Sequence, residues 1–337
     1  MSIKENVKRL LFNNPGLISN NIVKALILAY YKRLWSERSG NVVLTDIAVE
    51  NTNVCNARCE MCAYKDMKRN KKIMPLQDYA RIIDIAAAEN IKRLYLGQLG
   101  EPFTDKGIFD KMDYAIAKGM ELVSITTNAS LLDEAASRRL LGYPWKAISF
   151  SVDGATRGTY EEIRKGLEFE TVENNIVSFL KVRKELGRTD LRVRMQMAVY
   201  GKNKHEVDEY RVKWKERLVS GLDEIALLYA TNYAGLTGIE YSGDSAGRQV
   251  KVPCGRLWNH MITVAVNGDI PICCWDYDVD NNVGNVFREG SLKGLWNGQR
   301  MREVRKIHVD GGYGMIPLCA NCNDNFFVKP HFVIEKT

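Results

Sequence analysis

Eight cysteines give this sequence its chemical character. They fall into two groups: Cys55, Cys59 and Cys62 near the beginning, and Cys254, Cys273, Cys274, Cys319 and Cys322 near the end. Thiolates bind zinc and iron-sulfur clusters, and cysteines of a reducing compartment serve such chemistry more often than they form disulfides. Because a long cysteine-free stretch separates the groups, the sequence predicts two separate metal sites.

The first group has the spacing Cys-x3-Cys-x2-Cys. Three thiolates in one loop can bind three irons of a 4Fe-4S cube and leave the fourth iron open to a small molecule with an amine and a carboxylate. Structural zinc is the alternative, but a closed zinc site takes four ligands, and no fourth Cys or His lies nearby. We therefore expect Cys55, Cys59 and Cys62 to hold a cluster.

The second group offers four thiolates for a closed site, from Cys254, Cys273, Cys319 and Cys322. From spacing alone, both zinc and an iron-sulfur cluster fit such a set. Cys274 is left over, because adjacent residues of an extended chain point in opposite directions and Cys273 is the expected ligand. Cys274 is interpreted either as a small buried hydrophobe or as a hydrogen donor that lines the substrate cavity.

Alternating β-branched runs and helical patterns predict parallel strands joined by crossover helices. The six expected strands are 44–50, 92–97, 121–126, 147–152, 191–200 and 224–228. Helices are expected at 76–90, with Leu76, Tyr79, Ile82, Ile83 and Ala86 on one face, and at 172–185. Six βα units cannot close an eight-unit barrel, so the expected fold class is α/β, a partial (β/α)6 barrel with functional groups at the carboxyl ends of its strands.

Three parts are expected along the chain: an N-terminal helical segment (1–43), the partial barrel (44–235) and a small C-terminal α+β domain (236–337). In the last part, 261–266 and 268–273 predict a hairpin around an Asn-Gly turn, and a helix follows at 292–304. So small a region buries little apolar surface, and a metal centre would supply the missing cohesion.

The net charge of +7 is mild for 337 residues, so a nucleic-acid partner is not expected. One dense basic group, Lys65, Lys68, Arg69, Lys71 and Lys72, is interpreted as a solvated loop; the alternative is a guide for an anionic substrate. The run 22–31 is too short to span a bilayer and predicts a helix packed on the protein. With no secretory signal pattern at its start, the chain is expected in the cytoplasm.

The first cysteine group resembles the cluster loop of the radical SAM superfamily, CxxxCxxC with a large residue before the last cysteine, a place that Met61 fills here. Three further segments resemble that family: Leu99-Gly100-Glu101-Pro102 its GGEP motif, Thr126-Thr127-Asn128 its ribose-contacting segment, and Ser151-Val152-Asp153-Gly154 a cofactor motif. The resemblance implies that the open iron binds the amino and carboxylate groups of S-adenosylmethionine, and that the cofactor contacts are Gly100, Glu101, Pro102, Thr127, Asn128, Ser151 and Asp153. Arg164 is expected in a structural ion pair.

The C-terminal region resembles the SPASM/twitch extensions of that family, which carry auxiliary 4Fe-4S clusters. The residues concerned are 267–274, Gly284-Asn285-Val286, Leu295-Trp296 and the final CxxC pair. Full SPASM domains have seven cysteines and two clusters, so the cysteines here imply one auxiliary cluster, held by Cys254, Cys273, Cys319 and Cys322. The implied cofactors are S-adenosylmethionine and two 4Fe-4S clusters, and the implied protein partner is an electron donor such as flavodoxin or ferredoxin.

Members of the family with one auxiliary cluster, including 2-deoxy-scyllo-inosamine dehydrogenase and neomycin epimerase, act at a hydroxyl-bearing carbon. The resemblance therefore implies a 5'-deoxyadenosyl radical that removes hydrogen from such a carbon of a sugar or aminocyclitol. An electron passed to the auxiliary cluster would give a ketone, whereas hydrogen returned by Cys274 would give an epimer.

Two other functions stay open. One is peptide maturation, although the first forty residues are too short for a separate leader-peptide-binding domain; the other is a non-catalytic zinc-binding protein. The candidate substrate contacts, near the ends of the last two strands, are Arg194, Gln196, Tyr229 and Asn232.

Overall fold

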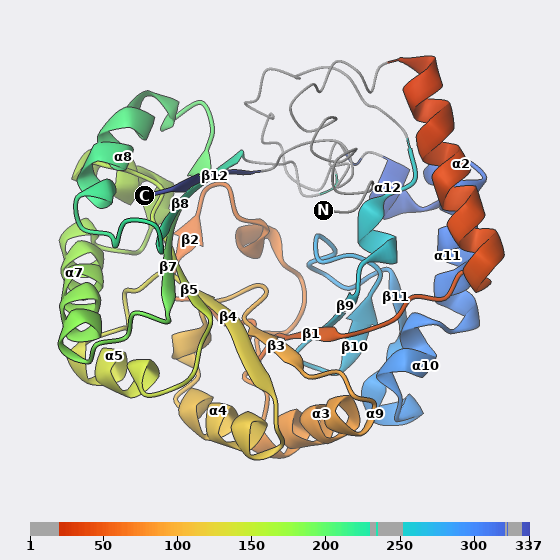
Figure 1. Ribbon diagram of the computed structural model, residues 1–337, viewed down its shortest axis with the longest axis horizontal. Coiled ribbons are helices and arrows are strands. Elements are labelled where there is room, and N and C mark those ends of the chain that lie inside the picture. Colours follow the sequence, from red (N-terminus) through yellow and green to blue (C-terminus); the bar gives the residue numbers. More distant parts are fainter. Residues whose placement is uncertain (1–19, 230–233, 235–251, 321, 323–331) are drawn as a thin grey trace.

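A curved, mostly parallel sheet is the centre of the computed structural model, which describes residues 20–229, 234, 252–320, 322 and 332–337 (Figure 1). The strand order is β12-β8-β7-β5-β4-β3-β1-β9. The central strands are β1 (Asp46–Val49), β3 (Arg93–Leu96), β4 (Glu121–Thr127), β5 (Ala147–Ser151), β7 (Arg192–Val199) and β8 (Glu224–Tyr229). All their neighbouring pairs are parallel, which confirms the six predicted strands and the partial (β/α)6 barrel.

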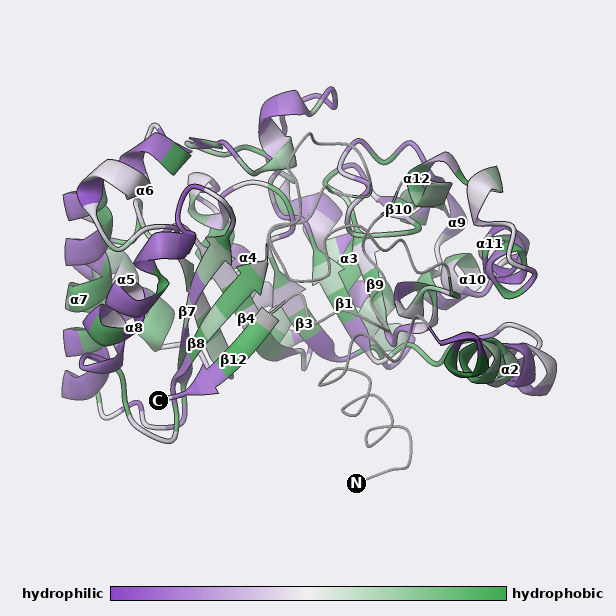
Figure 2. Cartoon of the chain, turned by 90° about the horizontal axis from the view of Figure 1, so that it is seen from above, coloured by the Kyte–Doolittle hydropathy of each residue, from purple (hydrophilic) through white to green (hydrophobic). Residues whose placement is uncertain are grey.

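The connecting helices cover the outer face of this sheet (Figure 1). They are α3 (Leu76–Ala88), α4 (Ile108–Ala117), α5 (Glu134–Leu141), α6 (Arg157–Ile163), α7 (Phe169–Glu185) and α8 (Val207–Lys215). In α3 the predicted face is buried at Tyr79, Ile82, Ile83 and Ala86, but Leu76, the first residue of the helix, is 45% exposed. The strands are mostly hydrophobic and the outward faces of the helices are mostly polar (Figure 2), as expected for a parallel sheet covered by helices.

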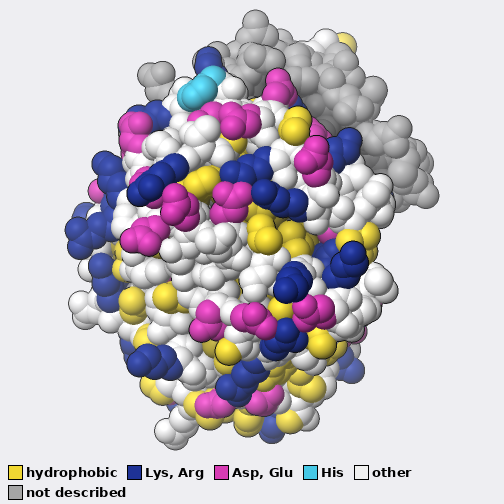
Figure 3. All heavy atoms as spheres, turned by 90° about the vertical axis from the view of Figure 1, so that its left-hand side faces the viewer, with side chains coloured by type: hydrophobic (Ala, Val, Ile, Leu, Met, Phe, Trp, Pro, Cys, Tyr) yellow, Lys and Arg dark blue, Asp and Glu magenta, His cyan; other side chains and the backbone are white. Residues whose placement is uncertain are grey.

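The outer helix faces carry charges of both signs. Figure 3 shows Lys, Arg, Asp and Glu side chains intermingled on the face that lies on the left of Figure 1, where α5, α7 and α8 are found. Some form exposed ion pairs, as between Arg138 and Glu134 at 2.7 Å. Beneath this surface, Arg183 of α7 pairs with Asp223 at 2.8 Å, and both side chains are almost fully buried.

Strands from the C-terminal region extend both edges of the barrel. Strand β9 (Met261–Val264) pairs in parallel with β1, and β12 (Phe332–Lys336) pairs antiparallel with β8. The predicted hairpin of 261–266 with 268–273 is therefore wrong in its strand pairing. The turn between the two segments is present. However, β10 (Asp269–Pro271) pairs with β11 (Asn282–Asn285) rather than with β9. Ile262 and Val264 are fully buried on β9, which gains more apolar burial beside β1 than in a two-stranded hairpin. The domain boundary at residue 235 stays a prediction.

Short helices follow in the C-terminal region. They are η5 (Gly255–Trp258), α9 (Val286–Glu289), α10 (Leu292–Trp296), α11 (Gln299–Val309), η6 (Tyr313–Met315) and α12 (Pro317–Ala320). The single helix predicted at 292–304 is wrong, because the chain ends α10 and begins α11 around Gly298. A Cβ atom on Gly298 would lie 2.7 Å from the carbonyl oxygen of Gly294, so glycine permits this close turn.

The N-terminal helix α2 (Asn21–Arg38) packs against α11. Asn20 caps the N-terminus of α2, where its side chain accepts a hydrogen bond from the Ile22 amide. Ile27 and Tyr31 are buried in a small cluster with Val252 and Val309, which confirms the predicted packed helix. Among the helices that the structure describes, none is both long and apolar enough to cross a membrane.

Candidate functional site

The first cysteine group lies on a loop that follows β1 and is fastened at several points. Its short strand β2 (Arg58–Cys59) pairs with β6 (Arg164–Lys165), which places Cys59 opposite Arg164. Cys62 begins the helical turn η2 (Ala63–Asp66), where its Sγ accepts a hydrogen bond from the Tyr64 amide at 3.4 Å. The Tyr64 hydroxyl lies 3.0 Å from the Cys55 amide nitrogen and 3.2 Å from its carbonyl oxygen. The loop is thus held by one strand pairing with the barrel and by hydrogen bonds within the loop itself.

The three cysteines line one cavity of about 250 Å³ at the carboxyl ends of the strands. The same cavity is lined by every predicted cofactor contact except Pro102, namely Gly100, Glu101, Thr127, Asn128, Ser151 and Asp153. Pro102 is buried at the start of η3 (Pro102–Thr104). Residues predicted from four separate segments are therefore brought together at one place.

Burial and mutual proximity mark the cysteines as one group. Burial, together with the nearby Cys62 thiol, raises the pKa of Cys55 to about 11 and that of Cys59 to about 12. The Arg164 guanidinium acts in the opposite direction and lowers the pKa of both thiols. Metal binding takes thiolates and releases protons, so a cation beside the sulfurs favours an iron-bound state. The donor set fits the first cluster.

In the described ranges, no three His, Cys, Asp or Glu side chains stand close enough together to hold a single metal ion. One zinc ion draws all of its sulfur ligands to about 2.3 Å from a single point. A cluster separates its thiolates, because each binds a different iron.

Glu101 joins the ends of two strands. Its buried carboxylate accepts hydrogen bonds from the Thr127 hydroxyl and the Asn128 amide, both at 2.7 Å, and from the Phe103 amide at 3.2 Å. Burial raises the pKa of this carboxyl group, while the three donors act against that rise. The Asn128 side chain in turn donates to Asn56 of the cysteine loop at 3.0 Å. Glu101 therefore positions the cavity wall.

Gly100 lies where the chain passes closest to the cysteine loop. Its φ is +100°, and a Cβ atom would lie 2.8 Å from the carbonyl oxygen of Val54. We predict that Gly100→Ala lowers the free energy of unfolding by about 2–5 kcal/mol, from backbone strain plus overpacking. Urea unfolding checks this against Gly187→Ala, where φ is +62° and nothing lies within 4 Å of the added carbon. Equal losses in the two variants would show that the close approach to Val54 is unimportant.

Beneath the cysteines lies a buried ion pair. Arg164 and Asp153 are 2.6 Å apart, and the second Asp153 oxygen accepts a hydrogen bond from the Ala198 amide at 2.6 Å. This confirms the structural ion pair expected for Arg164. The sequence did not reveal that the same guanidinium lies close enough to Cys55 and Cys59 to change their pKa.

The four predicted ligands of the second cysteine group pack against the same main core as the barrel; they are Cys254, Cys273, Cys319 and Cys322. Cys254 is close enough to Cys273 to raise its pKa, and the Cys322 amide bonds to the Cys319 carbonyl oxygen at 3.4 Å. The Cys273 sulfur accepts a hydrogen bond from the Trp275 amide at 3.4 Å, the arrangement also found at Cys62. Hydrogen bonds to ligand sulfurs are a means by which proteins tune iron-sulfur clusters.

Cys273 and Cys274 do not point in opposite directions, so that expectation is wrong. The chain bends after β10, and a hydrogen bond between the two sulfurs, together with burial, raises the pKa of Cys273. Arg256 donates to the Cys274 sulfur at 2.7 Å, and Gln98 donates to the Cys274 carbonyl oxygen at 3.0 Å. Cys274 lines the cavity that holds the first cysteine group.

Of the candidate substrate contacts, Gln196 lines this cavity. Arg194 is not part of the described lining and pairs with Glu224 at 2.7 Å, so its prediction as a substrate contact is not supported. Asn232 and the side chain of Tyr229 lie outside the described residues. Sequence reasoning missed Gln98, Trp275 and Tyr277, which also line the cavity. The place of Gln98 directly after a predicted strand could have identified it.

Comparison with known proteins gives matches to two family models. Residues 49–211 match the radical SAM superfamily, and residues 254–323 match SPASM, an iron-sulfur cluster-binding domain. The two matches together cover more than two thirds of the chain. Their boundaries enclose the first and the second cysteine groups.

Individual proteins resemble this chain over most of its length. A tungsten-containing aldehyde ferredoxin oxidoreductase cofactor-modifying protein of Pyrococcus furiosus is 22% identical over 82% of this chain and 86% of its own. BtrN in complex with AdoMet and 2-DOIA has a TM-score of 0.57 and 18% identity, covering 84% of this chain and 94% of BtrN. Streptococcus suis SuiB bound to its precursor peptide SuiA has a TM-score of 0.61 and 14% identity, covering 82% and 70%. The chain therefore belongs to the radical SAM superfamily, as an enzyme that uses S-adenosylmethionine and a 4Fe-4S cluster and carries an auxiliary cluster in its SPASM domain.

Proposed function

We propose that this enzyme removes hydrogen from a hydroxyl-bearing carbon of a sugar or aminocyclitol, with oxidation or epimerisation as the outcome. Cys55, Cys59 and Cys62 would hold the first cluster, and Cys254, Cys273, Cys319 and Cys322 the auxiliary one. When bound, the first cluster and S-adenosylmethionine supply a 5'-deoxyadenosyl radical. The observation that carries the proposal is the position of Cys274, which lines the same cavity as the first cysteine group.

The cavity suits a small polar substrate. Besides the predicted cofactor contacts, its lining includes the amide-bearing residues Gln98 and Gln196. Such groups can hold the hydroxyls of a sugar or cyclitol by hydrogen bonds, while Trp275 and Tyr277 provide aromatic surface. BtrN, whose described complex contains 2-DOIA, has a similar fold over 94% of its length, which is consistent with a chain built for a small molecule.

Two residues position the Cys274 thiol. Arg256 donates to its sulfur, and the guanidinium lies 4.9 Å from the centre of the Trp275 ring, so the aromatic ring supports the cation. Gln98 holds the Cys274 carbonyl oxygen from the end of β3. If this thiol returns hydrogen to the substrate carbon, the product is an epimer; if the carbon instead loses a further electron and a proton, the product is a ketone.

Peptide maturation is the second candidate function, and the structural similarity to SuiB bound to SuiA favours it. Product mass separates the candidates after incubation with S-adenosylmethionine and a reductant. Loss of two hydrogens indicates dehydrogenation, an unchanged mass with altered stereochemistry indicates epimerisation, and a crosslinked peptide indicates maturation. A crosslinked peptide, with no change in any sugar or aminocyclitol, would refute the proposal.

For an epimerase, Cys274→Ala is expected to leave 5'-deoxyadenosine release intact and to stop net epimerisation, because the hydrogen donor is gone. In deuterated buffer, chromatography measures the 5'-deoxyadenosine and mass spectrometry measures deuterium in the epimer, since the wild-type enzyme places solvent deuterium on the product carbon. Gln196→Ala removes a candidate substrate contact from the same cavity, so it should slow epimerisation, while the epimer that forms still carries the deuterium label. Unaltered deuterium incorporation in Cys274→Ala would remove this cysteine as donor.

A further inference from the structure

The loop 65–72, here called the basic loop, combines exposed lysines with one buried arginine. Lys65, Lys68, Lys71 and Lys72 are exposed, whereas the Arg69 side chain is only 13% exposed. The interpretation as a solvated loop is therefore wrong for Arg69. None of the four lysines belongs to the described lining of the cavity, so the interpretation as a substrate guide is not supported either.

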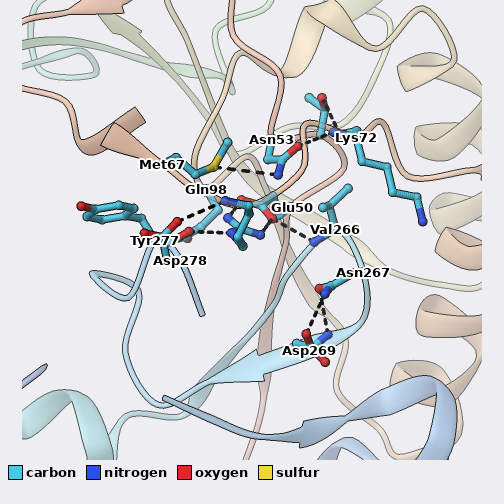
Figure 4. Close-up of polar contacts among 12 residues, drawn as sticks. Glu50, Asn53, Met67, Lys72, Gln98, Val266, Asn267, Asp269, Tyr277 and Asp278 are labelled. Carbon is cyan, nitrogen blue, oxygen red and sulfur yellow. Dashed lines mark hydrogen bonds and ion pairs between the residues drawn. The ribbon is translucent and has the colours of Figure 1, made fainter. Parts of the chain in front are cut away.

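Arg69 fastens the basic loop to two distant parts of the chain. Glu50 and Tyr277, which belong to these parts, lie near each other in Figure 4. The Arg69 guanidinium contacts both carboxylate oxygens of Glu50, at 2.8 and 2.9 Å, and donates to the Tyr277 carbonyl oxygen at 2.6 Å. Glu50, only 1% exposed, also accepts a hydrogen bond from the Val266 amide at 2.9 Å. Asp278 accepts a hydrogen bond from the Lys68 amide at 2.7 Å. A buried bidentate pair of this kind fixes geometry as well as charge.

Asn53 fixes the far end of the basic loop. This fully buried side chain donates to the Asn70 carbonyl oxygen at 3.0 Å. It also accepts a hydrogen bond from the Lys72 amide at 2.6 Å (Figure 4). The loop is therefore held from residue 68 to residue 72, and its lysines project from a preformed surface. Preformed surfaces lose less conformational entropy when a partner binds.

Tyr64 connects this surface to the first cysteine group. The ammonium group of Lys71 lies 4.8 Å from the centre of the Tyr64 ring, and the hydroxyl of that ring is hydrogen-bonded to the Cys55 backbone. Tyr64 itself is 5% exposed and lines the cavity. A cation-π contact and a hydrogen bond thus connect the basic loop, through Tyr64, to a predicted cluster ligand.

The charges of the basic loop are only partly neutralised. Lys65 pairs with Asp66 at 2.6 Å and Lys72 approaches Asp78 at 3.8 Å. In the part of the chain that the structure describes, no carboxylate lies within ion-pair distance of Lys68 or Lys71. Beside them, Ile73 and Leu76 are 41% and 45% exposed, so apolar side chains adjoin the cationic surface. A small acidic protein with an apolar contact area fits this combination.

We propose that the basic loop is the docking surface for a small acidic electron-transfer protein, which passes electrons along Tyr64 and Cys55 to the first cluster. The inference rests on the assignment of Cys55, Cys59 and Cys62 as ligands of that cluster. In each encounter the flavin or iron-sulfur group of the partner loses one electron and the cluster gains it. No bond forms or breaks in this step.

The test is anaerobic stopped-flow reduction of the cluster-loaded enzyme by the hydroquinone form of an acidic flavodoxin. We expect the double variant Lys68→Glu with Lys71→Glu to lower the second-order rate of cluster bleaching by tenfold or more at low salt, since charge complementarity accelerates association. Raising the salt concentration should slow the wild type and bring the two rates together. Photoreduced 5-deazariboflavin, a small uncharged reductant, should reduce both proteins at the same rate.

The matched control is Lys181→Glu with Lys184→Glu, two exposed lysines on α7. This change alters the net charge equally but leaves the basic loop intact, and it should leave the flavodoxin rate near that of the wild type. Equal rates for the two double variants would overturn the docking proposal while leaving the cluster assignment standing. A wild-type protein without any bleachable chromophore would instead refute the cluster assignment on which the proposal depends.

Discussion

Cys55→Ala, Cys59→Ala and Cys62→Ala are each expected to lower the iron content of the anaerobically reconstituted chain from about eight atoms to about four, because the first cluster is lost and the auxiliary cluster stays. Release of 5'-deoxyadenosine from S-adenosylmethionine should fall to background in all three variants. Iron and sulfide analysis, together with chromatography of the nucleoside, measures both effects.

Cysteines outside the first group serve as controls for this result. Cys319→Ala should also lose about four irons but should still release 5'-deoxyadenosine, since it affects only the auxiliary cluster. Cys274→Ala should keep about eight irons, because the seven other cysteines are the assigned ligands. Nucleoside release that survives loss of Cys55, Cys59 and Cys62 together would contradict the assignment.

The second large effect is expected at the ion pair below the cysteines. Arg164→Ala leaves the carboxylate of Asp153, which is 1% exposed, buried without its cation. Breaking a buried pair in this way costs about 3–5 kcal/mol of folding free energy. It also removes the positive charge that lowers the pKa of Cys55 and Cys59, so iron loading of the first site should fall as well. Urea unfolding and iron analysis measure the two effects separately.

The pair of Arg183 and Asp223 provides a matched control. It is as deeply buried, with 4% and 0% of the side chains exposed, but its hydrogen bonds join α7 to the backbone at the start of β7. Arg183→Ala should therefore destabilise the fold to a similar extent while iron loading per folded chain stays unchanged. An equal loss of iron per folded chain in Arg164→Ala and Arg183→Ala would show that Arg164 acts only through the stability of the fold.

Local sequence patterns predicted the barrel well, and the reason is physical. In β5 the residues Ala147 to Phe150 are all buried, and all except Ser149 are apolar. Such largely apolar runs stand out between amphipathic helices. The loops at the carboxyl ends of these strands then carry the polar motifs. Because parallel strands end at one edge of the sheet, the order of strands and motifs along the chain is enough to predict that Glu101, Asn128 and Ser151 lie together.

Contacts between distant segments could not be predicted in this way. The pairing of β9 with β1 joins residues more than two hundred positions apart, and no local pattern encodes that choice. The same holds for Arg69, whose partners Glu50 and Tyr277 belong to separate regions. At Cys273 and Cys274 the error had another source: the alternation of side chains holds only for an extended chain, and the chain bends there.

Electron paramagnetic resonance of the reduced Cys319→Ala variant tests whether the first cluster has an open iron, because that cluster is the expected paramagnetic centre of this variant. Addition of S-adenosylmethionine labelled with nitrogen-15 at its amino group should change the signal and produce a hyperfine coupling to that nitrogen, because the amine binds the iron that Cys55, Cys59 and Cys62 leave open. A signal that is unaffected by the labelled cofactor would contradict the assignment of an open iron that binds the cofactor amine.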